Sequence, residues 1–241
     1  MINPYDEEEY AKIYNSRYLD ENSNWPNDTK IELELIENCT GKTWCDVACG
    51  TGYHLSNVKK HFIKTGIDRG MAMLSQSVSN DIDLINLDIL DWNPKNKYDL
   101  VTNFWVGYTH QKSLDKVLQF LQKMVSVTNT GGTLMLSVFV GDKSYFTNPY
   151  SHRAVTANGL TNDFYFQAIQ WNYTEHDMPE HTYTCICPHP ELILETIAPH
   201  FETYKIINRE NSEYGCGTNE DGSTSYYGGA GKEMMIFENR L

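Results

Sequence analysis

A glycine-rich turn between an apolar run and a helix-like segment constrains the fold of this chain most. Residues 43–48 predict a strand and residues 51–61 a helix, and the turn between them reads Asp46-Val47-Ala48-Cys49-Gly50-Thr51-Gly52. Glycine lets a backbone turn sharply and approach a ligand closely. A strand, a Gly-x-Gly turn and a helix in this order therefore predict an α/β fold with a ligand site at the turn.

Strand-like and helix-like segments alternate from this turn to residue 140. Residues 71–79 and 113–127 predict helices, and the second has apolar residues at the period of an amphipathic helix. Strands are predicted at residues 65–68, 83–87, 98–105 and 133–140. The alternation predicts a Rossmann-like, mostly parallel sheet with helices on both faces.

We predict a single domain over residues 1–241, because an α/β chain of this length commonly folds as one unit. Residues 1–30 have tyrosines at helical spacing, which predicts an N-terminal helix before the core at residues 31–140; the family resemblance described below implies that this segment is a lid. Residues 142–185 are polar and aromatic, and they predict an antiparallel substrate cover with strands near 163–173 and 181–187.

Residues 186–241 are expected to complete the sheet. We predict a helix at residues 190–201, strands at 202–208 and 233–238, and a long loop rich in glycine and tyrosine at 214–231. A loop of that length in a compact domain is commonly functional.

The composition argues against several kinds of partner. The formal net charge is −13, and so acidic a surface repels phosphate backbones, so we expect no nucleic acid partner. The first ten residues include four acidic ones and no apolar run, and no stretch approaches the ~20 apolar residues of a membrane span. We therefore expect a cytoplasmic protein without a membrane partner.

The six cysteines form no Cys-x-x-Cys pair and show no zinc-ligand spacing. We expect reduced thiols that mostly fill the core, and no metal site.

Acidic residues end three successive predicted strands: Asp46, Asp68 and Asp88. The third glycine of a dinucleotide fingerprint is replaced by Leu55, and a carboxylate at the turn would repel a pyrophosphate. The same carboxylate would attract a ligand that has an ammonium and a sulfonium. An acid after the second strand can bind ribose hydroxyls, and one after the third can bind an adenine amino group. The three acids favour S-adenosylmethionine over NAD.

These motifs resemble, in order and spacing, those of class I S-adenosylmethionine-dependent methyltransferases. The resemblance covers roughly residues 40–140: the turn at 46–52, then 66–68 with Met73-Leu74, 87–88, 98–101, and the glycine turn at 131–134. Cys-Gly-Thr-Gly followed by His54-Leu55 resembles the small-molecule N-methyltransferases, including those that act on amino sugars.

The resemblance implies a seven-stranded sheet with the last strand inserted antiparallel and the cofactor across the carboxyl ends of the strands. It departs from the family at Arg69-Gly70, because the family often has serine or a similar residue two after the ribose acid. The residues that would bind the cofactor are Tyr14, Arg17, Asp46, Ala48, Gly50, Gly52, Asp68, Arg69, Met73, Asp88, Ile89, Asn103 and Phe104.

Methyl transfer needs alignment of the acceptor and exclusion of water, with a base only where the nucleophile loses a proton. The segment after the fourth strand would shape the acceptor site, through Asn103, Phe104, Trp105, Tyr108 and His110. We take His110 as the candidate general base, with His176 and His181 as alternatives. The resemblance further implies that Tyr14 or Tyr18 closes over the cofactor as a lid, which makes Tyr14 a candidate catalytic residue, and that Arg17 holds the cofactor carboxylate.

The sequence thus predicts an enzyme that methylates a small molecule, with an amine favoured and a hydroxyl as an alternative acceptor. Few positive charges and many aromatic residues are typical of a pocket for a cation or a hydroxylated ring. Rival functions are a peptide or protein N-methyltransferase, a thiol-handling or arsenic-type enzyme that uses Cys185 and Cys187, and a noncatalytic adenosyl-ligand-binding protein. Exposed aromatic segments are compatible with a homodimer.

Overall fold

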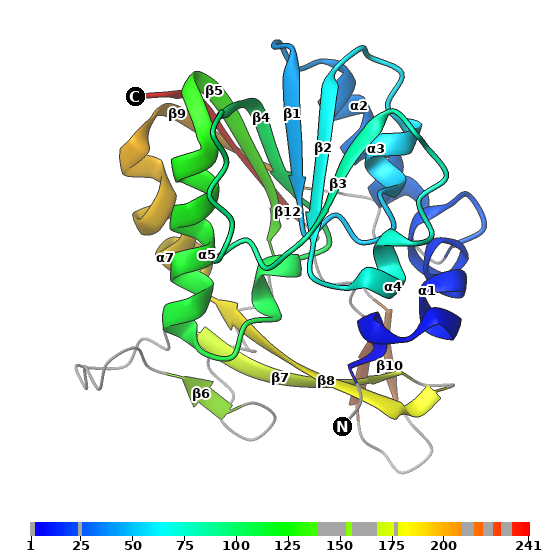
Figure 1. The fold of residues 1–241 in the computed structure, drawn as a ribbon. Coiled ribbons are helices and arrows are strands. Elements are labelled where there is room, and N and C mark those ends of the chain that lie inside the picture. The colour runs from blue at the N-terminus through cyan, green and yellow to red at the C-terminus, as the bar shows by residue number, and fades with distance from the viewer. Residues whose placement is uncertain are drawn as a thin grey trace.

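The computed structural model describes residues 3–23, 26–138, 153–155, 168–175, 178–208, 215–218, 224–227 and 233–241. Its centre is a seven-stranded sheet in the order β3-β2-β1-β4-β5-β12-β9 (Figure 1). Strands β3 to β5 in this order run parallel, whereas β12 is antiparallel to both of its neighbours. The predicted mostly parallel sheet with its antiparallel last strand is confirmed. Its strands are β1 (Thr43–Val47), β2 (Ile63–Asp68), β3 (Ile82–Asn86), β4 (Tyr98–Asn103), β5 (Thr128–Val138), β9 (Phe201–Asn208) and β12 (Glu233–Arg240).

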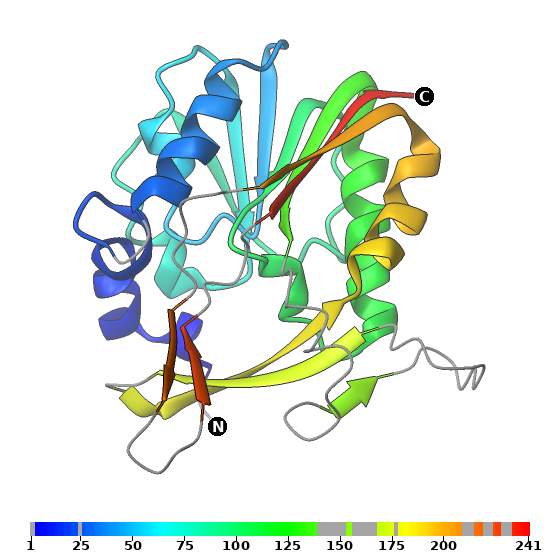
Figure 2. The same ribbon diagram turned by 180° about the vertical axis from the view of Figure 1, so that it is seen from behind.

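Helices cover both faces of this sheet (Figures 1 and 2). The side chains of β1 explain why: Trp44 packs in one buried cluster with residues of α2 and α3, and Cys45 and Val47 pack in another with residues of α5 and α7. A strand that is buried on both faces needs apolar residues at successive positions, which is the pattern read from the sequence. The helices are α1 (Glu8–Tyr14), α2 (Pro26–Glu37), α3 (Tyr53–Asn57), α4 (Met71–Leu74), α5 (Leu114–Val127) and α7 (Pro190–Ile197).

Two strands end before their predicted limits because the backbone turns. β1 ends at Val47 because Ala48 has a φ of 53°, in the left-handed region. β4 ends at Asn103, and Trp105 and Val106 follow with φ values of 53° and 52°. Left-handed residues other than glycine are uncommon and cluster where structure is set for function.

The predicted helices after β1 and β2 are also shorter than expected. α3 begins only after Gly52, which has a φ of 69°, and it ends before Val58, whose backbone is extended. α4 stops at Leu74, and the helix predicted at 190–201 gives way to a 3₁₀ turn at Ala198–His200. The strand predicted at 133–140 begins earlier, at Thr128.

A second sheet lies beside the carboxyl ends of the parallel strands (Figures 1 and 2). It is antiparallel and consists of β6 (Arg153–Val155), β7 (Ala168–Glu175) and β8 (Met178–Pro188), so antiparallel strands lie where residues 142–185 predicted them, and their role as a substrate cover stays a prediction. The loop predicted at 214–231 was wrong in part, because it contains the paired strands β10 (Gly215–Thr218) and β11 (Thr224–Tyr227).

The N-terminal segment packs against α4 and the edge of the pocket described below. It has a 3₁₀ turn at Pro4–Asp6, then α1, and then a π-helix at Asn15–Leu19. In the described part of the chain, no helix is both long and apolar enough to cross a membrane.

Candidate functional site

The glycine turn after β1 is held in place by Asp68, the last residue of β2. The backbone N–H of Gly50 donates to Asp68 Oδ2 at 2.8 Å, and the N–H of Gly70 donates to Asp68 Oδ1 at 2.7 Å. Burial raises the pKa of this carboxyl, and the two backbone hydrogen bonds oppose the shift. Each carboxylate oxygen has a second lone pair, so Asp68 can bind both loops and still accept further hydrogen bonds.

Asp46 is buried beneath the same turn. It accepts a hydrogen bond from Thr102 Oγ1 at 2.5 Å, and that hydroxyl accepts one from Trp44 Nε1 at 2.8 Å. Burial raises the pKa of Asp46 to about 6, while the nearby His54 and the bond from Thr102 act to lower it. A buried carboxylate with so raised a pKa favours any bound cation that can neutralise its charge.

A second buried polar group lies under the pocket. His54 Nε2 is 2.8 Å from Glu32 Oε2, and Ser137 Oγ donates to Glu32 Oε1 at 3.1 Å. The imidazole of His54 also packs against the ring of Phe104, with centroids 4.7 Å apart. The pair therefore connects α2, α3 and the segment after β4 at the pocket floor.

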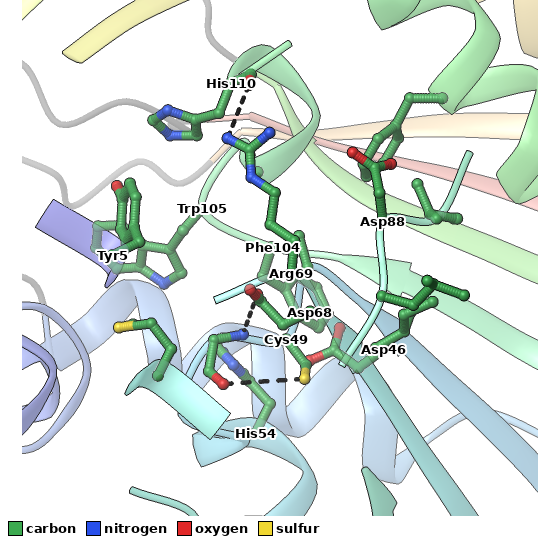
Figure 3. A pocket seen from close by; sticks show the side chains of 18 of the residues that line it. Tyr5, Asp46, Cys49, His54, Asp68, Arg69, Asp88, Phe104, Trp105 and His110 are labelled. Carbon is green, nitrogen blue, oxygen red and sulfur yellow. Dashed lines mark hydrogen bonds between the residues drawn. The ribbon is translucent and has the colours of Figure 1, made fainter. Parts of the chain in front are cut away.

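An open pocket with about 870 Å³ of empty space lies at the carboxyl ends of β1 to β4. Figure 3 shows Tyr5, Trp105 and His110 on one side of it and Asp46 and Asp88 on another. The lining residues are Tyr5, Tyr14, Leu19, Asp46, Ala48, Cys49, Gly50, His54, Ile67, Asp68, Arg69, Met73, Leu87, Asp88, Ile89, Phe104, Trp105, Gly107, His110, Gln111 and Phe120.

Aromatic rings from the N-terminal segment form one wall of the pocket. The ring of Tyr5 lies edge-on to His110, with centroids 5.2 Å apart, and Tyr14 packs on Tyr18 at 4.9 Å. Tyr18 in turn packs on Trp105 at 6.1 Å. The segment is tied to the glycine turn because Thr51 Oγ1 donates to Asn15 Oδ1 at 2.6 Å.

His110 lies where this wall meets the second sheet. Its backbone oxygen accepts a hydrogen bond from Arg69 Nη2 at 3.1 Å, and its Nδ1 is 3.7 Å from Cys185 Sγ in β8. Burial, assisted by the positive charge of Arg69, lowers the pKa of His110 to about 4. The imidazole is therefore uncharged at neutral pH.

Comparison with known proteins fits this geometry. Residues 45–132 match the family of methyltransferase domains. Over these residues the chain is similar to methyltransferase domains. The match and the fold agree with the predicted class, a class I methyltransferase that uses S-adenosylmethionine.

Relatives in sequence align with about half of this chain. A tRNA U34 carboxymethyltransferase of Shewanella sediminis is 29% identical over 138 residues, which is 52% of this chain and 40% of that protein. The enzyme of the same name from Shewanella woodyi is 30% identical over 132 residues, 49% of this chain and 38% of that protein. The chain thus aligns with about two fifths of the length of these relatives.

Similar solved structures extend over almost the whole chain. SAM-bound CalS10, an amino pentose methyltransferase from Micromonospora echinaspora, has a TM-score of 0.62 at 15% identity and covers 95% of this chain and 96% of its own. DesVI from Streptomyces venezuelae has a TM-score of 0.62 at 14% identity, with 95% and 98% covered. The sugar N-methyltransferase KedS8 from Streptoalloteichus has a TM-score of 0.58 at 15% identity, with 96% and 93% covered. At these identities the likeness shows the fold.

The structure brings most of the predicted site residues of this domain into one pocket. Gly52, Asn103 and Arg17 do not line it. Gly52 caps α3, and the Asn103 amide turns back to donate to the Val47 carbonyl oxygen at 2.6 Å. Those that line the pocket are Tyr14, Asp46, Ala48, Gly50, Asp68, Arg69, Met73, Asp88, Ile89, Phe104 and His110.

Sequence reasoning missed several lining residues as site candidates. Tyr5 is one of the tyrosines at helical spacing, and His54 follows the Cys-Gly-Thr-Gly turn. The sequence therefore contains a signal for both residues. The acceptor-side alternatives cannot be placed: His176 lies outside the described residues, and so does the side chain of His181. The others that were missed are Leu19, Cys49, Ile67, Leu87, Gly107, Gln111 and Phe120.

Free thiols are found at Cys39, Cys45, Cys49, Cys185 and Cys187. Cys185 and Cys187 are buried in the cluster beneath α5 and α7, and burial raises the pKa of both thiols. A raised pKa disfavours the nucleophilic thiolate. Among the residues that the structure describes, no group of three His, Cys, Asp or Glu side chains is placed to hold a metal ion.

Proposed function

We propose that this chain transfers a methyl group from S-adenosylmethionine to a small-molecule amine, with a hydroxyl as the alternative acceptor atom. The observation that supports this most directly is the pocket itself. Carboxylates that follow three neighbouring strands lie on one side of it, and aromatic rings with an uncharged imidazole lie on the other. The first arrangement suits an adenosyl ligand with cationic groups, and the second suits an acceptor.

The cofactor residues of this proposal follow the sheet. Asp46, Ala48 and Gly50 would hold the methionine end, because a buried carboxylate and a close backbone favour its ammonium group. Asp68 would accept hydrogen bonds from the ribose through its remaining lone pairs, and Asp88 and Ile89 would bind the adenine. Met73, Phe104, Tyr14 and the stem of Arg69 complete the lining. Arg17, Gly52 and Asn103 would support it from outside the pocket.

S-adenosylmethionine supplies an electrophilic methyl group on a sulfonium, so the task of the protein is to orient the acceptor and exclude water. An uncharged His110 can accept a hydrogen bond from an amine N–H and so direct the nitrogen lone pair. Tyr5, Tyr14 and Trp105 surround that position with aromatic faces, which attract the positive charge that the nitrogen gains. Tyr14 also belongs to the segment that would close the pocket.

A nucleic acid acceptor is the second candidate, because the relatives in sequence are named as tRNA-modifying enzymes. The net charge of −13 argues against it, since affinity for nucleic acid comes largely from cationic contacts with phosphates. Peptide and protein acceptors, a noncatalytic binding role, a homodimer and a cytoplasmic location stay predictions.

Calorimetric titration with S-adenosylmethionine, S-adenosylhomocysteine and NAD tests the cofactor. We expect saturable binding of both adenosyl ligands and none of NAD, and failure of both adenosyl ligands to bind would overturn the proposal. Formation of S-adenosylhomocysteine is then measured with small amines, matched alcohols, a peptide and unmodified tRNA. Turnover on tRNA alone would replace the small-molecule acceptor with the second candidate, and binding without turnover on any acceptor would favour a noncatalytic role.

A further inference from the structure

Arg69 has a place in the pocket that the proposed cofactor contacts do not explain. Of the pocket-lining residues in the described part of the chain, it alone is an arginine or lysine, in a protein with a net charge of −13. Its residue is exposed, and Figure 3 shows the guanidinium reaching away from Asp68 towards His110. Its positive charge acts on the neighbouring Asp68 carboxylate. A cation at this position also attracts an anionic group of a ligand that enters the pocket beside it.

The guanidinium has most of its donors available. Arg69 Nη2 donates to the His110 backbone oxygen at 3.1 Å, which fixes the direction of the side chain. Within the described ranges, no carboxylate lies within ion-pair distance of it and its other N–H groups have no protein acceptor. A guanidinium has five N–H donors in a planar fork, a geometry that matches carboxylates and phosphates.

Gln111 adds a second donor at the same place. It follows His110 and lines the pocket, and its side-chain amide has no hydrogen-bond partner among the residues that the structure describes. An amide NH₂ and a guanidinium both donate hydrogen bonds, and such bonds are strongest when the acceptor is an ionised carboxylate or phosphate. Both are next to His110, which contacts β8 of the second sheet through Cys185. The donors therefore lie on the acceptor side, away from the methionine end at Asp46.

We propose that Arg69 and Gln111 bind an anionic group of the methyl acceptor, so that the acceptor is a small amine that also has a carboxylate or a phosphate. This inference rests on the proposed function, because it assigns the acceptor of the same site. One end of the acceptor would be held by the guanidinium and the Gln111 amide, and its nitrogen would lie at His110 and the aromatic wall. Acceptors without the acidic group would lose the contact with the Arg69 guanidinium and the Gln111 amide.

Matched probes test this with the protein saturated with S-adenosylhomocysteine. β-Alanine is compared with β-alaninamide, and phosphoethanolamine with ethanolamine, by calorimetric titration of the wild-type protein. We expect one probe with an acidic group to bind at least about tenfold more tightly than its partner without that group, a difference of the size measured for charge-assisted hydrogen bonds. The two pairs also distinguish a carboxylate from a phosphate. Equal binding within each pair would overturn the inference.

Variants then assign the preference to these side chains. Arg69→Met keeps the length of the stem and removes the charge, so the preference for the acidic probe should fall to about twofold or less, whereas Arg69→Lys should keep part of it. Gln111→Glu should weaken binding of the probe with the acid and should not weaken binding of its partner without the acid, because the new carboxylate repels only the anionic group. If Arg69→Met instead weakens S-adenosylhomocysteine and leaves the ratio within each pair intact, Arg69 is a cofactor contact and the inference is wrong. Failure of the wild type to bind S-adenosylhomocysteine would instead sink the proposed function itself.

Discussion

Asp46 should make the affinity for the cofactor depend on pH. Its carboxyl is buried under the glycine turn, and burial raises its pKa to about 6. If the cofactor ammonium binds the ionised form, then only about one tenth of the protein is competent at pH 5 and nearly all of it at pH 8. The dissociation constant for S-adenosylhomocysteine should therefore be about tenfold higher at pH 5 than at pH 8, or about 1.4 kcal/mol.

Asp46→Asn is the matched control, because an amide keeps an oxygen that can accept from Thr102 Oγ1. The variant should bind more weakly at pH 8 and show no dependence on pH in this range. The same substitution should stabilise the empty protein. Because the pKa of Asp46 is higher in the folded state than in the unfolded state, the free energy of unfolding falls as pH rises from about 4 to 6. Removing the charge should recover up to about 3 kcal/mol of this free energy at pH 7.

The assays are calorimetric titration from pH 5 to pH 8 and urea denaturation of the ligand-free protein at pH 7. A wild-type affinity that stays constant over this range would refute the assignment of Asp46 to the cationic end of the ligand. An equal pH dependence in wild type and Asp46→Asn would place the titrating group elsewhere.

Three further predictions follow from the site. Asp68→Ala should weaken binding of S-adenosylhomocysteine by about 1–3 kcal/mol and also lower the denaturation midpoint, because the carboxylate holds the N–H groups of two loops; unchanged affinity would remove it from the ribose site. His110→Ala should slow methyl transfer while the calorimetric affinity for S-adenosylhomocysteine stays within about twofold, and an unaltered rate would exclude a role for its imidazole. Glu32→Ala should destabilise the protein by about 1–3 kcal/mol in urea, because it leaves the buried His54 ring without its hydrogen-bond partner; Glu32→Gln, which can still accept a hydrogen bond, should cost clearly less, and equal losses would contradict this account.

The sequence predicts the frame of this fold well because the strands of the main sheet are buried on both faces. Such strands appear as short apolar runs, and the acid that follows each run marks the carboxyl edge of the sheet, which is where Asp46, Asp68 and Asp88 lie. The paired strands β10 and β11 gave no such signal, because Gly215-Cys216-Gly217-Thr218 has neither alternation nor β-branched residues apart from its end.

Side-chain direction is the part that a single sequence could not give. Asn103 follows β4 as a site residue should, but its amide bonds to the Val47 carbonyl of the neighbouring strand, a contact that depends on the pairing of β1 with β4. Arg69 looked like a departure from a family motif, and only the fold shows its guanidinium beside His110. Both outcomes depend on residues more than thirty positions away in the chain.

The three strand-end acids look equivalent in the sequence, yet their surroundings give them different chemistry. Asp68 holds two backbone N–H groups, and Asp88, half-buried at the pocket edge, accepts only the N–H of Leu90 among the described residues. Asp46 alone is buried with a raised pKa of about 6 and a hydroxyl as its hydrogen-bond donor. The carboxylate that the protein stabilises least gains most from a bound cation. Asp46 should therefore contribute most of the electrostatic preference for a cationic ligand. Asp46→Asn should therefore reduce discrimination between adenosyl ligands with and without the ammonium group more than Asp88→Asn does. Equal effects in calorimetric titrations with S-adenosylhomocysteine and 5′-methylthioadenosine would refute this division of roles.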